Sequence, residues 1–116
     1  MLETMRPSGV VVATTLLVHQ RRDDILAFMV KHRLPAFYTG RAFVDAGGLG
    51  SYAPNLAVHY RRVAAFVDRI LKGARPGDLP IEQPTKYELV VNLKIAKALG
   101  LTIPPSVLGR ADEIIQ

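Results

Sequence analysis

Hydroxyl, aromatic and amide side chains gather between residues 38 and 55, in a pattern that suits the binding of a small molecule. An aromatic ring stacks on the apolar part of a ligand, while hydroxyl and amide groups bond its polar end. The residues predicted to bind ligand in this way are Tyr38, Thr39, Ser51, Tyr52 and Asn55. The alternative interpretation is a glycine-rich turn, at which Asn55 only caps a helix.

Catalytic, metal-binding and nucleotide-binding patterns are missing from the sequence. His19, His32 and His59 lack the close spacing that ligates a metal ion. The chain has no Cys, which removes disulfides, thiolate ligands and cysteine nucleophiles. No segment follows the phosphate-binding pattern G-x-x-x-x-G-K-S/T or G-x-G-x-x-G. We therefore expect a chain that is not an enzyme, with no catalytic residue, no metal and no cofactor.

The composition is that of one globular domain, because 49% of the 116 residues are hydrophobic and 22% are charged. A mean hydropathy of +0.18 predicts apolar surface that a partner subunit or a missing part must cover. The net charge of +5 comes from scattered Lys and Arg with no nucleic-acid-binding module, so we predict no nucleic-acid partner.

No apolar run approaches the roughly 20 residues that span a bilayer. The first residues, M-L-E-T-M-R-P-S-G, lack the apolar stretch of a signal peptide, so the sequence as it stands predicts a cytoplasmic chain.

The elements that must position the candidate residues begin with a strand at 9–14, a helix at 19–32 and a strand at 35–38. This order is a βαβ unit, whose two strands run parallel. A short helix at 41–46, closed by Gly47–Gly48, and a brief strand at 48–52 follow. Asn55 then caps a strong amphipathic helix at 56–72, which Gly73 ends.

The C-terminal part is predicted to begin with an extended connector at 73–86, which is rich in Pro and Gly. A strand at 87–93, a helix at 94–99 and an extended stretch at 103–105 come next. The segment 106–115 is predicted to be a terminal helix.

Two segments resemble the C-terminal part of ABC-transporter substrate-binding proteins of the tryptophan/tyrosine type. They are F-V-D-A-G-G-L-G-S-Y-A-P-N at 43–55 and the long stretch at 60–115, of which D-L-P-I-E-Q-P-T-K-Y-E-L-V-V-N-L-K is the most diagnostic. Ser51 and Tyr52 match the family's S-Y-G stretch at the cleft, with Ala53 in place of Gly. Ile95 stands where the family's N-L-K-T-A-K has Thr.

The resemblance implies part of a type I periplasmic-binding-protein fold, in which two α/β lobes close on a ligand. We expect an α/β chain with a mostly parallel sheet flanked by helices, completed by dimerisation. Residues 1–8 would be a non-matching N-terminal extension. Residues 9–116 would be a single α/β domain that corresponds to the second lobe and its crossover segments.

The implied function is that of a solute-binding component of an ABC transporter, or a truncated remnant of one. It would bind a small organic ligand such as an amino acid, meet an ABC permease outside the cytoplasm, and form a homodimer. A second hypothesis is a cytoplasmic, non-catalytic dimerisation or regulatory module that has lost transport. A basic nucleic-acid binder is a third.

Overall fold

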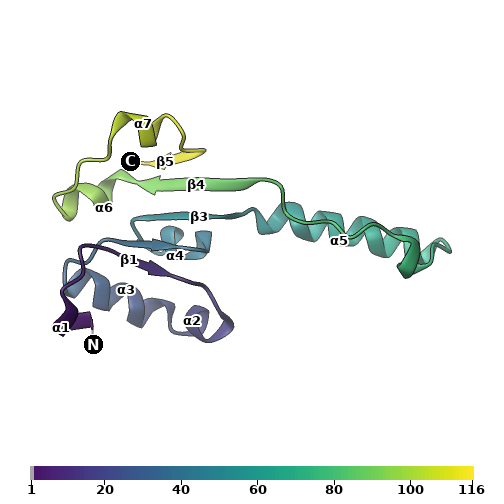
Figure 1. The fold of residues 1–116 in the computed structure, drawn as a ribbon, viewed down its shortest axis with the longest axis horizontal. Coiled ribbons are helices and arrows are strands. Elements are labelled where there is room, and N and C mark those ends of the chain that lie inside the picture. The colour runs from purple at the N-terminus through teal and green to yellow at the C-terminus, as the bar shows by residue number, and fades with distance from the viewer. Residues whose placement is uncertain (1) are drawn as a thin grey trace. The chain divides into compact units, whose positions relative to one another are not determined.

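The computed structural model describes residues 2–116, with side chains from Thr4 onward; Met1, the first residue of the segment 1–8, lies outside the described residues. The chain forms two compact units (Figure 1). The first contains the residues up to Ala53 together with Glu88–Gln116, and the second is Pro54–Tyr87.

The first unit is built on a mixed five-stranded sheet with the order β1-β2-β3-β4-β5. The strands are β1 (Val10–Val12), β2 (Ala36–Tyr38), β3 (Gly50–Pro54), β4 (Tyr87–Asn92) and β5 (Glu113–Ile115). The pairs β1·β2, β2·β3 and β4·β5 are parallel. β3 and β4 run in opposite directions (Figure 1), so the predicted mostly parallel α/β sheet is confirmed.

The described part of this unit has six helices: α1 (Leu2–Met5), α2 (Leu16–Gln20), α3 (Arg22–Lys31), α4 (Arg41–Asp45), α6 (Leu93–Ala98) and α7 (Pro105–Leu108). The helix predicted at 19–32 is thus two helices, which meet at Arg21. Thr15 starts the first of them earlier than predicted, because its side chain accepts a hydrogen bond from the Val18 N–H.

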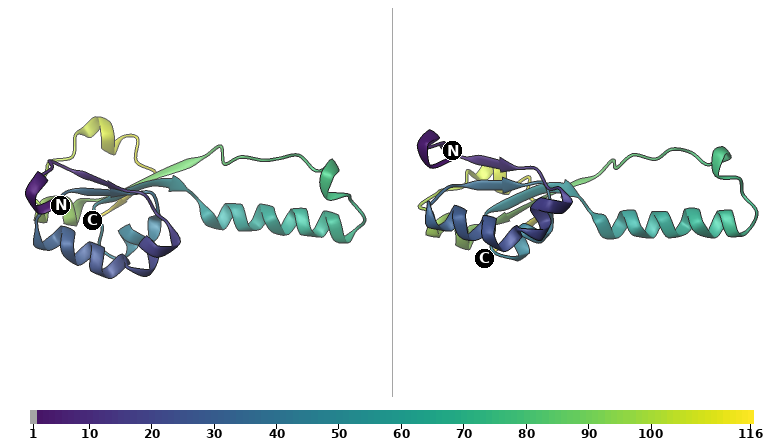
Figure 2. Two further views of the ribbon diagram at one scale, coloured as in Figure 1. Left: turned by 60° about the horizontal axis from the view of Figure 1, so that its bottom comes forward. Right: turned by 90° about the horizontal axis from the view of Figure 1, so that it is seen from below.

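The predicted βαβ unit is confirmed, with Val10 opposite Ala36 and Val12 opposite Tyr38 in the β1·β2 pair. Side chains alternate across a strand, so these four residues share one face of the sheet. α3 and α4 cover that face (Figure 2), and Leu26, Met29 and Phe43 complete the core there. The other face carries the intervening side chains, among them the exposed Val11.

The predicted terminal helix at 106–115 is wrong. α7 ends at Leu108, and Glu113–Ile115 form β5 instead. The Asp112 carboxylate accepts a hydrogen bond from the Leu89 N–H at 2.8 Å, and the Asp112 N–H donates to the Leu89 carbonyl at 2.8 Å. These bonds to β4 hold the chain extended where its local pattern favours a helix.

The second unit contains α5 (Leu56–Leu71), the short 3-10 helix η1 (Pro76–Asp78) and an extended connector. The Asn55 side chain accepts a hydrogen bond from the Val58 N–H at 3.2 Å, which confirms the predicted helix cap. Gly73 adopts a φ of 104° after the helix, as the predicted stop requires. Every residue of this unit is described, and none of them is buried.

Among the described residues, no helix has both the length and the apolar character needed to cross a membrane.

Candidate ligand-binding site

Two threonines meet where β1 and β2 end. The Thr39 N–H donates to the Val12 carbonyl at 3.2 Å, so Thr39 continues the pairing of the strands. The Thr39 hydroxyl accepts from the Thr14 N–H at 2.7 Å and lies 3.0 Å from the Thr14 hydroxyl. Because ligands of open α/β sheets bind beyond the carboxyl ends of the strands, this hydroxyl pair occupies the expected edge.

Tyr52 lies on β3 near the same edge and is 57% exposed. Tyr38 pairs with Ser51 in the β2·β3 register, and extending that register by one residue places Thr39 level with Tyr52. The fold therefore places two residues that are 13 apart in the sequence at the same level of neighbouring strands.

Ser51 and Tyr52 are neighbours in the sequence but point to opposite faces of the sheet, because side chains alternate along a strand. Ser51 is 1% exposed and lies on the face that carries Tyr38. Its hydroxyl has no hydrogen-bond partner within the described part of the chain. Ser51 and Tyr52 therefore cannot contact a ligand from the same side of the sheet.

Removal of the Ser51 hydroxyl is expected to leave the free energy of unfolding unchanged or raised. A buried hydroxyl without a partner costs about 1–3 kcal/mol, and Ser51→Ala removes that cost while deleting one atom. Urea unfolding of the two proteins measures the difference. A loss of more than about 1 kcal/mol in the variant would show that the hydroxyl has a bonding partner in solution.

Tyr38 lies in the core and is 2% exposed. Its ring stacks on Phe43 with centroids 4.7 Å apart and an angle of 12° between the planes. Burial also raises the pKa of the Tyr38 hydroxyl. The ring is thus already occupied by a protein partner, and of the two tyrosines predicted to bind ligand, Tyr52 is the one with an exposed ring.

Asn55 belongs to the second unit, where its side-chain oxygen accepts the Val58 N–H as the cap of α5. The structure thus confirms the capping role. The ligand-binding role of Asn55 stays a prediction.

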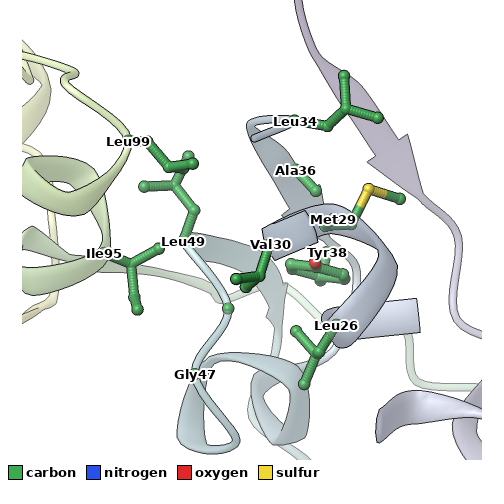
Figure 3. A pocket seen from close by; sticks show the side chains of 11 residues that line it. Leu26, Met29, Val30, Leu34, Ala36, Tyr38, Gly47, Leu49, Ile95 and Leu99 are labelled. Carbon is green, nitrogen blue, oxygen red and sulfur yellow. The ribbon is translucent and has the colours of Figure 1, made fainter. Parts of the chain in front are cut away.

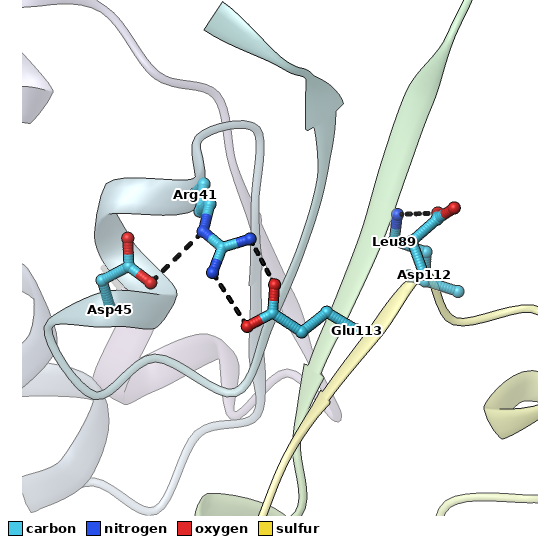
Figure 4. A network of polar contacts seen from close by, with 5 residues as sticks. All are labelled: Arg41, Asp45, Leu89, Asp112 and Glu113. Atoms are coloured by element: carbon cyan, nitrogen blue, oxygen red, sulfur yellow. Dashed lines mark hydrogen bonds and ion pairs between the residues drawn. The ribbon is translucent and has the colours of Figure 1, made fainter. Parts of the chain in front are cut away.

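Sequence reasoning missed an ion pair between α4 and β5 (Figure 4). The Arg41 guanidinium donates two hydrogen bonds to the Glu113 carboxylate, at 2.6 and 2.9 Å, and its Nε lies 3.4 Å from Asp45. No local signal links Arg41 to Glu113, since 72 residues separate them. The pair connects α4 to the C-terminal strand. It also occupies the guanidinium, which would otherwise be available to a ligand carboxylate.

This ion pair predicts a loss of stability in acid. The hydrogen bond from Arg41 lowers the pKa of Glu113 below its usual value. A carboxyl with a lowered pKa in the folded state stabilises the fold above the pKa of the unfolded chain, and this stabilisation disappears as the pH falls through the folded value. Glu113→Gln is therefore expected to lower the melting temperature at pH 7, and to lower it less in acid, where the Glu113 carboxyl is protonated.

Melting curves across this pH range test that expectation, with Arg41→Lys as the companion variant. Lys keeps the positive charge but cannot donate two parallel hydrogen bonds to the carboxylate. Arg41→Lys should therefore lower the melting temperature at pH 7 by less than Glu113→Gln does, and this loss should likewise shrink in acid. If Glu113→Gln lowered the melting temperature equally at pH 7 and in acid, the ion pair with Arg41 would not be the source of the stabilisation.

A shallow apolar hollow of about 20 Å³, open to solvent, lies near the amino ends of β2 and β3 (Figure 3). Its lining comes from α3, α6 and the Gly47–Leu49 segment, with Val30, Leu49, Ile95 and Leu99 around its mouth. The hollow lies on the face of β2 that carries Ala36 and Tyr38. It offers few polar groups to orient an amino acid, so the threonine edge is the better candidate.

Among the residues that the structure describes, no group of three or more His, Cys, Asp or Glu side chains is placed to hold a metal ion.

The chain resembles known proteins along nearly all of its length. A family model described as ABC transporter substrate binding protein matches residues 4–115, beginning inside the segment 1–8. Among curated proteins, no sequence matches.

Solved structures with a similar fold include the following three. The ABC domain of a Streptococcus pneumoniae protein in complex with L-Trp has 27% identity over 98% of this chain, with a TM-score of 0.89. A conserved domain protein from Vibrio cholerae has 25% identity over 94%, with a TM-score of 0.88. A ligand-free, open substrate binding protein with adhesive properties from Clostridium difficile shares the fold, at 21% identity over 92% and a TM-score of 0.62. The chain spans 36–39% of the length of these three proteins.

Proposed function

The chain belongs to the ABC transporter substrate-binding protein family, and from this premise we propose that it binds an amino acid with an aromatic side chain. The observation that carries the proposal is the similarity, over 98% of the chain, to a protein whose structure contains L-Trp. The exposure of Tyr52, on the strand next to the one that Thr39 follows, supports it from within the chain. Because the chain spans 39% of that relative, it supplies only part of such a protein.

The proposed mechanism is binding without chemistry. The ring of Tyr52 stacks on the aromatic side chain of the ligand, and the Thr39 hydroxyl bonds its polar end. Ser51 and Tyr38 support the sheet from its core, and Asn55 caps α5. The ligand leaves unchanged and is delivered to an ABC permease, outside the cytoplasmic membrane.

A thermal-shift screen against the common amino acids tests this proposal. Ligand at 100 times its Kd stabilises the fold by about 2.7 kcal/mol, which raises the melting temperature by roughly 10 °C. L-Trp, L-Tyr and L-Phe should raise it, whereas L-Ala and L-Asp should not. A melting temperature that no amino acid changes would contradict amino-acid binding by this chain.

We also propose that the chain self-associates as a homodimer. This proposal is supported by large apolar side chains that are exposed in both units, among them Val11, Leu16, Tyr60, Val63 and Leu71. Apolar surface on this scale is uncommon on soluble monomers and marks interaction sites.

A further inference from the structure

The hydroxyl groups of Thr14 and Thr39 bond each other and leave one hydrogen over. The Thr39 hydroxyl accepts the Thr14 N–H at 2.7 Å, and 3.0 Å separates the two hydroxyl oxygens. A hydroxyl group carries one hydrogen and two lone pairs, so the pair has two hydrogens in total. The bond between the two oxygens uses one of them. The other is left to bond a group outside the pair.

The hydrogen that is left over belongs to Thr14. The hydrogen bonds run in one direction, from the Thr14 N–H to the Thr39 hydroxyl and from there to Oγ1 of Thr14. An oxygen that accepts a hydrogen bond becomes a better donor, because each bond polarises the next. The Thr39 hydroxyl is therefore the donor within the pair. In the described part of the chain, the Thr14 hydroxyl accepts this bond and donates none.

Gly40 leaves the space in which the Thr14 hydroxyl lies. A Cβ on Gly40 would be 3.0 Å from Oγ1 of Thr14 and 3.4 Å from its Cγ2. The backbone does not require glycine here, since a φ of −155° is extended and open to any residue. A side chain at position 40 would instead crowd the hydroxyl that bonds Thr39. The fold thus keeps the Thr14 hydroxyl at the edge where the strands end.

Of the two charged groups of an amino acid, only the carboxylate can accept the hydrogen of Thr14. A hydroxyl that donates to a carboxylate forms a short, charge-assisted bond. The ammonium group has donors alone and can use only the lone pairs of the hydroxyls. The Thr39 oxygen keeps one lone pair after it has accepted the Thr14 N–H. The pair therefore suits both groups at once, with the carboxylate at Thr14 and the ammonium at Thr39.

We propose that the Thr14 hydroxyl is a ligand-binding group and donates its remaining hydrogen to the carboxylate of the bound amino acid. The inference rests on the proposed function and deepens it, because it divides the polar end of the ligand between two residues. The chain accordingly selects against aromatic amines that lack a carboxylate, of which tryptamine is the example closest to L-Trp.

Two indole compounds test the assignment. L-Trp and tryptamine differ by the carboxylate, and the anisotropy of their indole emission reports binding because the chain has no Trp. The native chain should bind L-Trp at least about tenfold more tightly than tryptamine, since a hydrogen bond to a charged group is lost. Thr14→Val keeps the shape of the side chain without the hydroxyl. It should raise the Kd for L-Trp at least about tenfold and change the Kd for tryptamine less than about threefold.

Two further variants serve as controls. Thr14→Ser keeps the hydroxyl and should bind L-Trp within about threefold of the native chain. Gly40→Ala crowds the same hydroxyl, so it should also weaken the binding of L-Trp more than that of tryptamine. Circular dichroism and melting curves check that each variant folds.

The assignment is overturned if Thr14→Val binds L-Trp as tightly as the native chain, or if Thr14→Ser binds it as weakly as Thr14→Val. Equal weakening of L-Trp and tryptamine by Thr14→Val would overturn it as well, because a purely structural role has that effect. Equal native affinities for the two compounds would overturn the carboxylate contact and leave aromatic binding in place. A native chain that binds neither compound would contradict the proposed function and this inference with it, so the two failures give different results.

Discussion

Replacing Gly48 by Ala is expected to lower the free energy of unfolding by about 1–3 kcal/mol. A Cβ at this position would lie 2.8 Å from the Phe43 carbonyl oxygen and 2.8 Å from Cε2 of Tyr38. Neither neighbour can move easily, because Phe43 and Tyr38 are buried and stacked on each other. The added methyl group must therefore displace backbone or separate the two rings.

Urea unfolding followed by circular dichroism measures this loss. Gly77→Ala is the matched control, since a Cβ there would meet no atom within 4 Å in the described part of the chain. It is expected to change the free energy of unfolding by less than about 0.5 kcal/mol. Equal stability of the two variants would show that the rings do not pack as described.

Replacing Tyr52 by Ala is expected to weaken the binding of an aromatic amino acid at least about tenfold. A stacked aromatic pair contributes about 0.5–1.5 kcal/mol beyond the area that it buries, and the loss of buried area adds to this. The effect on folding should be smaller than that of Gly48→Ala, because the Tyr52 side chain is largely exposed.

Tyr52→Phe keeps the ring and is expected to bind within about threefold of the native chain. If Tyr52→Ala bound as well as the native protein, the ring of Tyr52 would not contact the ligand. If Tyr52→Phe bound as weakly as Tyr52→Ala, the hydroxyl and not the ring would carry the affinity.

The parts of the fold that the sequence predicts correctly depend on signals between nearby residues. The β-branched run at 10–12 and the helix stop before Pro35 locate the βαβ unit. Asn55 and Gly73 mark the ends of α5 through a capping hydrogen bond and a positive φ, both of which follow from residue type.

The parts that could not be predicted depend on contacts between distant residues. β5 is three residues long and exists because it pairs with β4, which no local pattern specifies. The bonds between Arg41 and Glu113 likewise join residues with no sequence relation. The placement of Ser51 and Tyr52 on opposite faces of the sheet could, by contrast, have been predicted, because neighbouring side chains alternate along a strand. That signal was present in the predicted strand at 48–52.

The most direct test of ligand binding uses the fluorescence of the ligand, because the chain contains no Trp. Any indole emission therefore comes from added L-Trp, whose anisotropy reports its immobilisation on the protein. If the chain binds L-Trp, the anisotropy should rise with protein concentration to a plateau. It should return to its initial value when an excess of a non-fluorescent competitor, such as L-Phe, is added. An anisotropy that stays at the value of free L-Trp up to millimolar protein would contradict the proposal that this chain binds an aromatic amino acid.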